Sequence, residues 1–253
     1  MASFQNQVVV ITGAGAGLGR GMALAFGREG AKVMVSDIDE ESGQETVALV
    51  QKAGGTAAFY KANVAHYHQV DKLMAVTVEH FGRIDIGINN AGIGGGQMAR
   101  LADISLIDYQ KTIDVNLSGV FYCMQAELKQ MLAQGGGKIV NVASVAGLRP
   151  LANASVYSAT KHAVVGLTKT AAIEYARKNI RINAVCPVFT HSNMVQSMFD
   201  QSPELEQKLV KTIPMGRYGQ PEDVAQAVLW LCSEQNNFLT GHALPIDGGS
   251  AAV

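Results

Sequence analysis

The sequence predicts an α/β protein in which seven parallel strands form one doubly wound sheet with helices on both faces. Short runs of β-branched and other apolar residues recur along the chain, as expected of strands covered on both faces. Segments with helical periodicity separate these runs, and this alternation builds a parallel sheet through right-handed crossovers. No repeat or Pro/Ser-rich linker divides the chain, so we expect a single domain spanning residues 1–253.

The pattern predicts the position of each element. The predicted strands are Gln7–Thr12, Ala31–Ser36, Ala57–Ala62, Ile84–Asn89, Lys138–Val142, Ile180–Val185 and His242–Ile246. The clearest helical segments are Arg20–Glu29, Leu106–Gln134, Val156–Arg177 and Pro221–Cys232. Trp230, in the last of these helices, is predicted to lie in the core. Ligand sites are expected at the edge of the sheet where the strands have their carboxyl ends.

Composition excludes several classes of function. The 20 basic and 21 acidic side chains nearly balance and form no basic cluster that would bind nucleic acid or a membrane surface. No apolar run approaches the roughly 20 residues that cross a bilayer, and no secretory signal pattern is present. We therefore expect a cytoplasmic protein. The three widely spaced cysteines are expected to be buried free thiols, and no metal site is predicted because no His/Cys cluster has ligand spacing.

A glycine-rich turn follows the first strand and predicts a phosphate site. Gly13, Gly17 and Gly19 lie in this turn, Leu18 separates the last two, and a helix follows. Free backbone N–H groups and the positive end of the helix then meet at one place, where a pyrophosphate would bind. The spacing differs from G-x-G-x-x-G, so the turn alone is weak evidence.

Asp37, at the end of the second strand, predicts NAD as the cofactor rather than NADP. A carboxylate there can accept hydrogen bonds from both hydroxyls of the adenosine ribose and would repel a 2′-phosphate. The turn holds no Arg or Lys before Arg20, and Ile38 and Asp39 follow Asp37, so no cation is placed to bind that phosphate. The alternative role for Asp37 is to cap the helix that begins near Glu40.

Residues at two further strand ends extend the predicted cofactor site. Asn63 and Val64 follow the third strand, where an adenine edge could be hydrogen-bonded. Asn90, Ala91 and Gly92 follow the fourth strand. Small residues and side-chain amides allow a ligand to approach closely and brace the neighbouring turn.

Tyr157 and Lys161 are the predicted centre of the chemistry. They lie four residues apart on one predicted helix and therefore share a face. An ammonium beside a phenol would lower the pKa of the phenol toward the working pH and make Tyr157 a general acid/base. Ser144 ends the fifth strand, and Asn116 lies inside an apolar helical segment, where an amide either bends the helix or serves a site.

Taken together, these motifs resemble those of the classical short-chain dehydrogenases/reductases. The resemblance covers essentially the whole chain and rests on Thr12-Gly13-x-x-x-Gly17-x-Gly19, Asn90-Ala91-Gly92, Asn116, Ser144, Tyr157-x-x-x-Lys161 and Asp247-Gly-Gly. Tyr-x-x-x-Lys alone would be weak evidence, because short motifs also arise by chance. The resemblance implies a Rossmann-like fold, an NAD-dependent oxidoreductase, and a homotetramer with the predicted helices Leu106–Gln134 and Val156–Arg177 at one interface.

The resemblance also implies a role for each catalytic residue. Tyr157 would exchange a proton with the substrate oxygen, and Lys161 would lower the pKa of that phenol and bind the nicotinamide ribose. Ser144 would orient the substrate oxygen, and Asn116 would hold a water that connects Lys161 to solvent. Hydride would pass directly between nicotinamide and substrate carbon. The predicted cofactor contacts are Gly13, Gly17, Leu18, Gly19, Asp37, Ile38, Asn63, Val64, Asn90, Ala91, Gly92, Tyr157, Lys161, Pro187, Thr190 and Ser192.

The chain departs from the family pattern after Pro187. Val188 stands where the family commonly has glycine, Thr190 replaces an aliphatic residue, and Ser192 replaces threonine. These departures fall on the predicted contacts to the nicotinamide. Asn63 also replaces a frequent Asp, an isosteric change that keeps a side-chain acceptor.

Residues 188–215 are predicted to form a substrate-binding lid. This segment is rich in Met and Phe and follows the carboxyl end of a strand, which suits a mobile cover over an apolar substrate. The predicted substrate contacts are Ser144, Ala146, Leu148, Asn153, Tyr157, Phe189 and Met194. They are mainly apolar, and of the nearby residues Arg149 could bind an anion. We expect a neutral, fairly hydrophobic secondary alcohol or its ketone as the small-molecule substrate.

Two other functions stay open. A 3-oxoacyl-thioester reductase, acting on an acyl carrier protein or CoA substrate, would use the same motifs. Asp37 and the missing basic patch for an acidic carrier argue against it. A catalytically silent NAD-binding protein would not need Asn116, Ser144, Tyr157 and Lys161 together.

Overall fold

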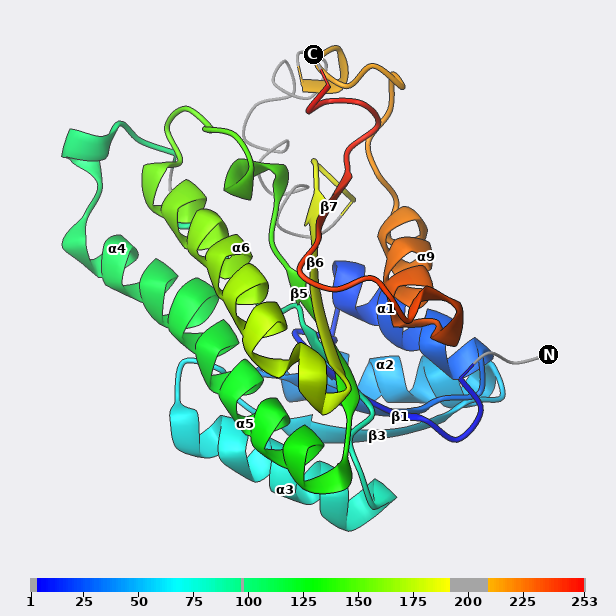
Figure 1. Cartoon of the computed structure of the whole chain (residues 1–253). Coiled ribbons are helices and arrows are strands. Elements are labelled where there is room, and N and C mark those ends of the chain that lie inside the picture. The colour runs from blue at the N-terminus through cyan, green and yellow to red at the C-terminus, as the bar shows by residue number, and fades with distance from the viewer. Residues whose placement is uncertain (1–3, 97, 192–208, 253) are drawn as a thin grey trace.

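A seven-stranded parallel sheet forms the centre of the computed structural model, which describes residues 4–96, 98–191 and 209–252 (Figure 1). The strand order is β3-β2-β1-β4-β5-β6-β7, and every neighbouring pair is parallel. The strands are β1 (Val8–Thr12), β2 (Lys32–Asp37), β3 (Thr56–Lys61), β4 (Ile86–Asn89), β5 (Gly137–Val142), β6 (Ile180–Pro187) and β7 (Ala243–Ile246). The predicted fold class is confirmed. The order reverses between β1 and β4, and sheets of this kind bind ligands at such a switch point.

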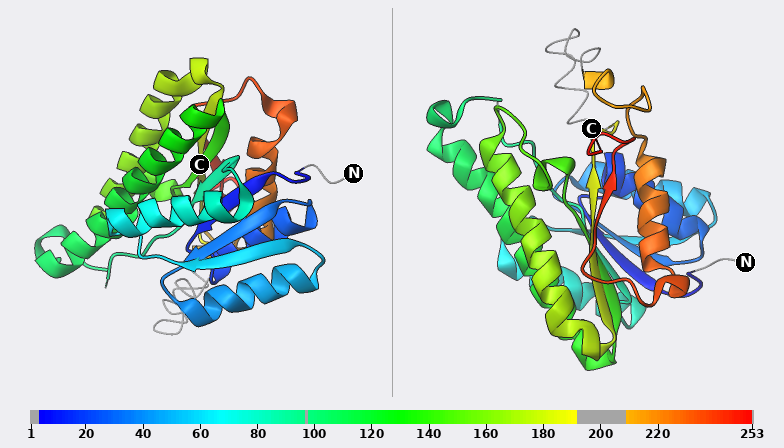
Figure 2. Two further views of the ribbon diagram at one scale, coloured as in Figure 1. Left: turned by 90° about the horizontal axis from the view of Figure 1, so that it is seen from below. Right: turned by 45° about the horizontal axis from the view of Figure 1, so that its top comes forward.

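Helices cover both faces of the sheet (Figure 2). Helices α1 (Gly17–Arg28), α2 (Glu40–Lys52) and α9 (Pro221–Cys232) share one core cluster, and α3 (Tyr67–Phe81), α5 (Gly119–Gln134) and α6 (Ser155–Tyr175) share the other. Short 3₁₀ turns are η1 (Leu101–Asp103), η3 (Val145–Gly147), η4 (Ala176–Lys178) and η5 (Glu234–Asn236). No helix of the described ranges is long and apolar enough to cross a membrane.

The inner strands are buried on both faces, as their continuous apolar runs predict, whereas the edge strands β3 and β7 are only partly buried. All five residues of β1 are buried. Val10 packs into the cluster with α3, α5 and α6, whereas Val9 and Ile11 pack into the cluster with α1, α2 and α9. This alternation follows from the two-residue period of a strand. The three cysteines are buried and free, as predicted.

Trp230 is not a core residue, contrary to the sequence prediction. Its side chain is 47% exposed. Helix α9 buries Val224, Val228 and Leu231 against the sheet. Trp230 precedes Leu231 by one residue and so points to a different side of the helix.

The predicted helix Leu106–Gln134 consists of three pieces. Helix α4 (Leu106–Ile113) leads into a π turn, η2 (Asp114–Ser118), and α5 follows. The backbone N–H of Gly119 bonds to the carbonyl of Asp114, five residues back. Helix α4 contacts α6, whereas α5 packs against α3, β4 and β5. π turns of this kind often occur at functional sites.

Candidate active site

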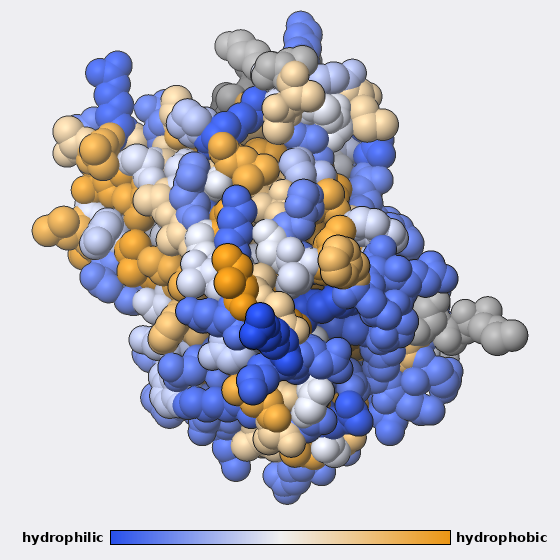
Figure 3. Space-filling view, viewed as in Figure 1, coloured by the Kyte–Doolittle hydropathy of each residue, from blue (hydrophilic) through white to orange (hydrophobic). Residues whose placement is uncertain are grey.

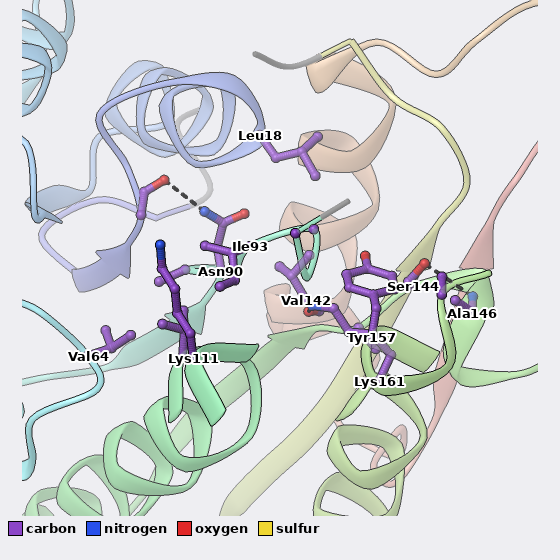
Figure 4. Close-up of a pocket in the computed structure, with 18 of the residues that line it drawn as sticks. Leu18, Val64, Asn90, Ile93, Lys111, Val142, Ser144, Ala146, Tyr157 and Lys161 are labelled. Carbon is purple, nitrogen blue, oxygen red and sulfur yellow. Dashed lines mark hydrogen bonds between the residues drawn. The ribbon is translucent and has the colours of Figure 1, made fainter. Parts of the chain in front are cut away.

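A cavity of about 2000 Å³ lies at the carboxyl edge of the sheet and extends across the switch point. Figure 4 shows Val64 toward one end, Ser144, Tyr157 and Lys161 at the other, and Leu18 between them. The cavity brings together most of the predicted site residues: Gly13, Gly17, Leu18, Asp37, Ile38, Asn63, Val64, Asn90, Ala91, Gly92, Ser144, Ala146, Tyr157, Lys161, Pro187, Phe189 and Thr190.

The glycine turn presents an open helix N-terminus to this cavity. Helix α1 begins at Gly17, and the residue before it, Ala16, provides no side-chain cap. The first turn of the helix contains no acidic residue, so its free N–H groups and positive end can receive an anion. Gly13 has a φ of 63°, which favours glycine. A Cβ on Gly19 would lie 2.2 Å from the carbonyl oxygen of Gly13, so Gly19 packs beneath the turn rather than lining the cavity.

Asn90 braces the glycine turn. Its Nδ2 donates to the carbonyl oxygens of Thr12 at 2.9 Å and Gly13 at 2.8 Å. The hydroxyl of Thr12 in turn accepts from the backbone N–H groups of Asn90 and Ala91, each at 3.2 Å. These bonds join the ends of β1 and β4, as predicted for the side-chain amides at this edge.

Asp37 is held by two backbone N–H groups. Gly15 donates to Oδ2 at 2.8 Å, and Asp39 donates to Oδ1 at 3.1 Å. Helix α2 is capped by Asp39, whose side chain accepts from the N–H groups of Glu41 and Ser42. The alternative role of Asp37 as the helix cap is therefore wrong. Its carboxylate lines the cavity in a fixed orientation.

Lys161 and Tyr157 lie together at the other end of the cavity, on α6. The Nζ atom of Lys161 lies 5.5 Å from the centre of the Tyr157 ring and donates to the carbonyl oxygen of Val142 at 2.9 Å. Ser144 follows β5, and its Oγ accepts from the N–H of Ala146 at 3.1 Å. Figure 4 shows the Ser144 side chain beside the phenol.

The protein shifts the pKa values of this pair by burial. Desolvation lowers the pKa of Lys161 to about 8. Burial raises the pKa of Tyr157, and the hydrogen-bonding influence of Ser144 offsets part of that rise. The predicted lowering of the phenol pKa by Lys161 is therefore not found in the protein alone. The ammonium lies over the ring and bonds to Val142, so its charge is not directed at the hydroxyl.

Asn116 lies in the π turn beneath the cavity and is fully buried. Its Nδ2 donates to the carbonyl oxygen of Ile93, and its Oδ1 accepts from the N–H of Ile93, both at 2.8 Å. A Cβ on Gly92 would lie 3.4 Å from Oδ1 of Asn116 and 3.6 Å from Nζ of Lys161. Asn116 thus fixes the loop after β4 next to Lys161.

The end of β6 forms a wall that includes the departures from the family pattern. Pro187, Val188, Phe189 and Thr190 all line the cavity. The Oγ1 of Thr190 donates to the carbonyl oxygen of Val188 at 2.9 Å and is itself buried. Ser192, Met194 and most of the predicted lid lie outside the described residues.

Two predicted substrate contacts do not reach the cavity. Leu148 is 37% exposed, and Asn153 has a φ of 61° in an exposed turn. Neither lines the cavity. Leu151 and Ala154 line it instead, because the loop between η3 and α6 turns its other side toward the site.

Some residues around the site were not found from the sequence. Ile107 and Lys111 of α4 line the cavity; their spacing of four residues was the available signal.

Behind the site, the fully buried Glu127 accepts from Nδ2 of Asn89 at 3.0 Å. Desolvation raises the pKa of Glu127 to about 7. Its carboxyl group lies over Gly87, where a Cβ would be 2.1 Å from Oε1.

Known proteins match the chain over almost its full length. A family model described as enoyl-(acyl carrier protein) reductase matches residues 13–251. The cyclohexanol dehydrogenase of Acinetobacter sp. (strain SE19) is 44% identical over 245 residues, which cover 97% of this chain and 95% of that protein. The chain belongs to the short-chain dehydrogenase/reductase family.

Other members of the short-chain dehydrogenase/reductase family agree in fold and sequence. The crystal structure of levodione reductase has a TM-score of 0.94 and 38% identity, with 99% of each chain covered. The 3-oxoacyl-(acyl-carrier-protein) reductase FabG of Thermotoga maritima is 38% identical over 245 residues, covering 97% of this chain and 98% of that protein. As a short-chain dehydrogenase/reductase, the chain is an oxidoreductase, and such relatives bind NAD(H) or NADP(H).

Proposed function

We propose that this oxidoreductase uses NAD(H) to interconvert a neutral, fairly hydrophobic secondary alcohol and its ketone. The observation that carries the proposal is one cavity with a fixed carboxylate, Asp37, toward the dinucleotide end and Tyr157 with Ser144 at the other. A catalytically silent NAD-binding protein would not need Tyr157 and Ser144.

The residues present fit a dinucleotide. The uncapped start of α1 offers N–H groups to a pyrophosphate, and both oxygens of Asp37 keep a lone pair for the ribose hydroxyls. Gly92 leaves room beside Lys161, which a side chain would fill. NAD is favoured over NADP because the carboxylate of Asp37 would repel a 2′-phosphate.

The catalytic work of the protein is to orient the substrate oxygen and move its proton. When bound, NAD supplies the hydride acceptor, or NADH the donor. The hydroxyl of Tyr157 gives or takes the proton of the substrate oxygen, and the hydroxyl of Ser144 holds that oxygen in place. Lys161, with a pKa of about 8, can exchange a proton near neutral pH. Asn116 holds the loop beside Lys161 in place through its two hydrogen bonds to the backbone of Ile93.

The walls near Tyr157 favour an apolar substrate. Val145, Leu151 and Phe189 line this end of the cavity. Arg149 also lines it, but its Nη2 donates to the buried hydroxyl of Ser250 at 2.7 Å, which directs the guanidinium toward the C-terminal turn. The similarity to a cyclohexanol dehydrogenase and to levodione reductase supports a cyclic alcohol or ketone.

A substrate screen tests the proposal. Purified protein would be assayed with NAD or NADP against cyclohexanol, 1-phenylethanol and matched 2-hydroxy acids, with each enantiomer scored separately. We expect turnover of the neutral alcohols with NAD. A strong preference for the hydroxy acids would contradict the proposed substrate class, and a strong preference for NADP would contradict the proposed cofactor.

A 3-oxoacyl-thioester reductase is the second candidate, and the similarity to FabG favours it. Reductive biosynthesis usually draws on NADPH, which Asp37 would disfavour. Acetoacetyl-CoA with NADPH or NADH is the discriminating assay. Turnover of this thioester well above that of any alcohol or simple ketone would make the second candidate the better description.

The exposed apolar side chains of α4 and α6 support a homotetramer. Leu106 and Ile107, which also line the cavity, are 83% and 80% exposed, and Ile173, near the C-terminal end of α6, is 82% exposed. Figure 3 shows apolar residues gathered over α4. Exposed apolar patches often mark a ligand site or an interface with another protein, and copies of one chain usually assemble symmetrically. Light scattering of the purified protein would give the number of subunits.

A further inference from the structure

Arg20 follows the glycine turn, and its side chain reaches from α1 back to the turn and across to α2. Its Nη2 donates to the carbonyl oxygen of Gly15 and to that of Ser42, the latter at 3.3 Å. The same nitrogen pairs with the carboxylate of Glu45, and Nε donates to Oγ1 of Thr46 at 3.0 Å. The planar fork of an arginine can serve several acceptors at once.

Gly15 is the centre of these contacts. Its carbonyl oxygen accepts from Arg20 and lies 3.3 Å from the fully buried hydroxyl of Thr46, whose single hydrogen it shares with the carbonyl oxygen of Ser42 at 3.1 Å. Its N–H donates to Oδ2 of Asp37 at 2.8 Å. A Cβ on Gly15 would lie 2.9 Å from both Oδ2 of Asp37 and Oγ of Ser42, so the glycine is closely enclosed. The position of the Asp37 carboxylate therefore depends on a peptide that Arg20 holds.

The ion pair with Glu45 makes this arginine a poor candidate for a phosphate ligand. The ion pair neutralises the guanidinium, and the carbonyl oxygens of Gly15 and Ser42 use its donors. A 2′-phosphate at Asp37 would have to compete with all these partners. Arg20 thus lies near the adenosine end of the site, and its hydrogen bonds go to other residues of the protein.

We propose that Arg20 is a positioning residue for the adenosine end of the cofactor site. It fixes Gly15 and, through the N–H of Gly15, the carboxylate that would bind the adenosine ribose. Thr46 is the second support of the same peptide, and Glu45 orients the arginine. This role rests on the proposed binding of a nicotinamide dinucleotide.

Calorimetric titration with NAD⁺, together with steady-state kinetics, tests the role. Arg20→Gln is expected to weaken NAD⁺ binding about tenfold, since the two carbonyl hydrogen bonds and the ion pair are lost, while kcat at saturating NAD⁺ stays unchanged. Arg28→Gln is the matched control, because Arg28 is exposed at the other end of α1. In an Asp37→Ala background, the effect of Arg20→Gln should shrink to about twofold or less, because the route through Asp37 is gone.

Two milder variants keep the proposal falsifiable if Arg20→Gln does not fold. Arg20→Lys retains the charge but loses the separate Nε donor to Thr46, and Thr46→Val removes one hydroxyl at constant shape. Each should weaken NAD⁺ binding about threefold without changing kcat. Unchanged affinity in both, or an equal fall in kcat, would overturn the role of Arg20. Wild-type protein that binds NADP⁺ and not NAD⁺ would instead contradict the proposed cofactor.

Discussion

The ammonium of Lys161 lies 5.5 Å from the centre of the Tyr157 ring and bonds to the carbonyl oxygen of Val142, not to the phenol hydroxyl. The two groups share a helix face, as residues four apart must. Burial, however, acts on each of them more strongly than they act on one another: it raises the pKa of the phenol and lowers that of the lysine. A dry pocket makes the proton easier to retain on Tyr157 and easier to lose from Lys161.

Tyr157→Phe should lower kcat by about 10²–10⁴-fold, the usual contribution of a general acid/base. The ring still fills its place, so NAD⁺ affinity should change by less than about twofold. Steady-state kinetics and calorimetry measure the two quantities. Tyr175→Phe, on the same helix and packed against the core, serves as the control. Turnover retained by Tyr157→Phe would remove this tyrosine from the chemistry.

Lys161→Met should abolish turnover yet make the fold more stable at pH 7. The folded pKa is lowered from 10.5 to about 8, so the native state binds fewer protons than the unfolded chain between these values. The stability of the wild type then rises with pH through that window, and the cost of the buried charge, up to about 3 kcal/mol, is fully present below pH 8. Thermal unfolding at pH 7 and pH 9.5 should show the variant's advantage shrinking at the higher pH. A variant less stable than wild type at pH 7 would contradict this account.

Glu127→Gln should stabilise the protein in alkaline but not in acidic buffer. Burial raises the pKa of Glu127 from 4.5 to about 7, so the native state binds more protons than the unfolded state in that range. Stability is therefore lost as pH rises from 4.5 through 7, by about 3 kcal/mol in all. Urea unfolding should show a gain for the variant of about 2–3 kcal/mol at pH 8 and little at pH 5. Equal stability of both proteins at pH 8 would mean that this carboxyl group does not titrate as described.

Asn116→Leu should damage both stability and turnover. It leaves the N–H and carbonyl of Ile93 without their partners, at a cost of about 1–3 kcal/mol. The loop beside Lys161 would loosen, and kcat should fall more than NAD⁺ affinity. Asn116→Asp keeps the acceptor and loses the donor, so the stability of this variant should lie between those of the wild type and Asn116→Leu. An Asn116→Leu variant with wild-type kcat would show that the loop does not need this support.

Asp37→Ala should bring the affinities for NAD⁺ and NADP⁺ closer together. The ribose hydroxyls lose charge-assisted hydrogen bonds, which weakens NAD⁺ binding about tenfold or more, and the repulsion of a 2′-phosphate disappears. Titration with each nucleotide gives the ratio. Glu40→Ala, an exposed carboxylate in the first turn of α2, controls for the general loss of negative charge. An unchanged ratio in Asp37→Ala would end the case for Asp37 as the selecting residue.

The strands and the ordered motifs could be predicted because their signals are local. A continuous apolar run such as that of β1 predicts a strand covered on both faces. Helical spacing alone predicts that Tyr157 and Lys161 lie on one face of α6. The glycine turn and Asp37 follow from their positions at strand ends. Their hydrogen bonds to Asn90 and Gly15 are the partners such groups require.

Other features depend on pairs that are far apart in sequence. Glu127 is buried because Gly87 on β4 leaves space for its carboxyl group, and neither residue shows this by itself. Trp230 is exposed because the register of α9 on the sheet places Leu231 inward instead. The π turn could not be located either. An amide in an apolar helix face indicated either a bend or a site, and Asn116 forms part of both a π turn and the site.

The π turn also sets the rotational phase between α4 and α5. One extra residue in a helix turns everything after it by about 100°. Asn116 faces Ile93, and Glu127, further along the same helical segment, faces Asn89, so the two contacts together fix how α5 is turned toward β4. The number of residues between Asn116 and Glu127 is therefore constrained. Insertions and deletions accumulated by related chains should spare this stretch.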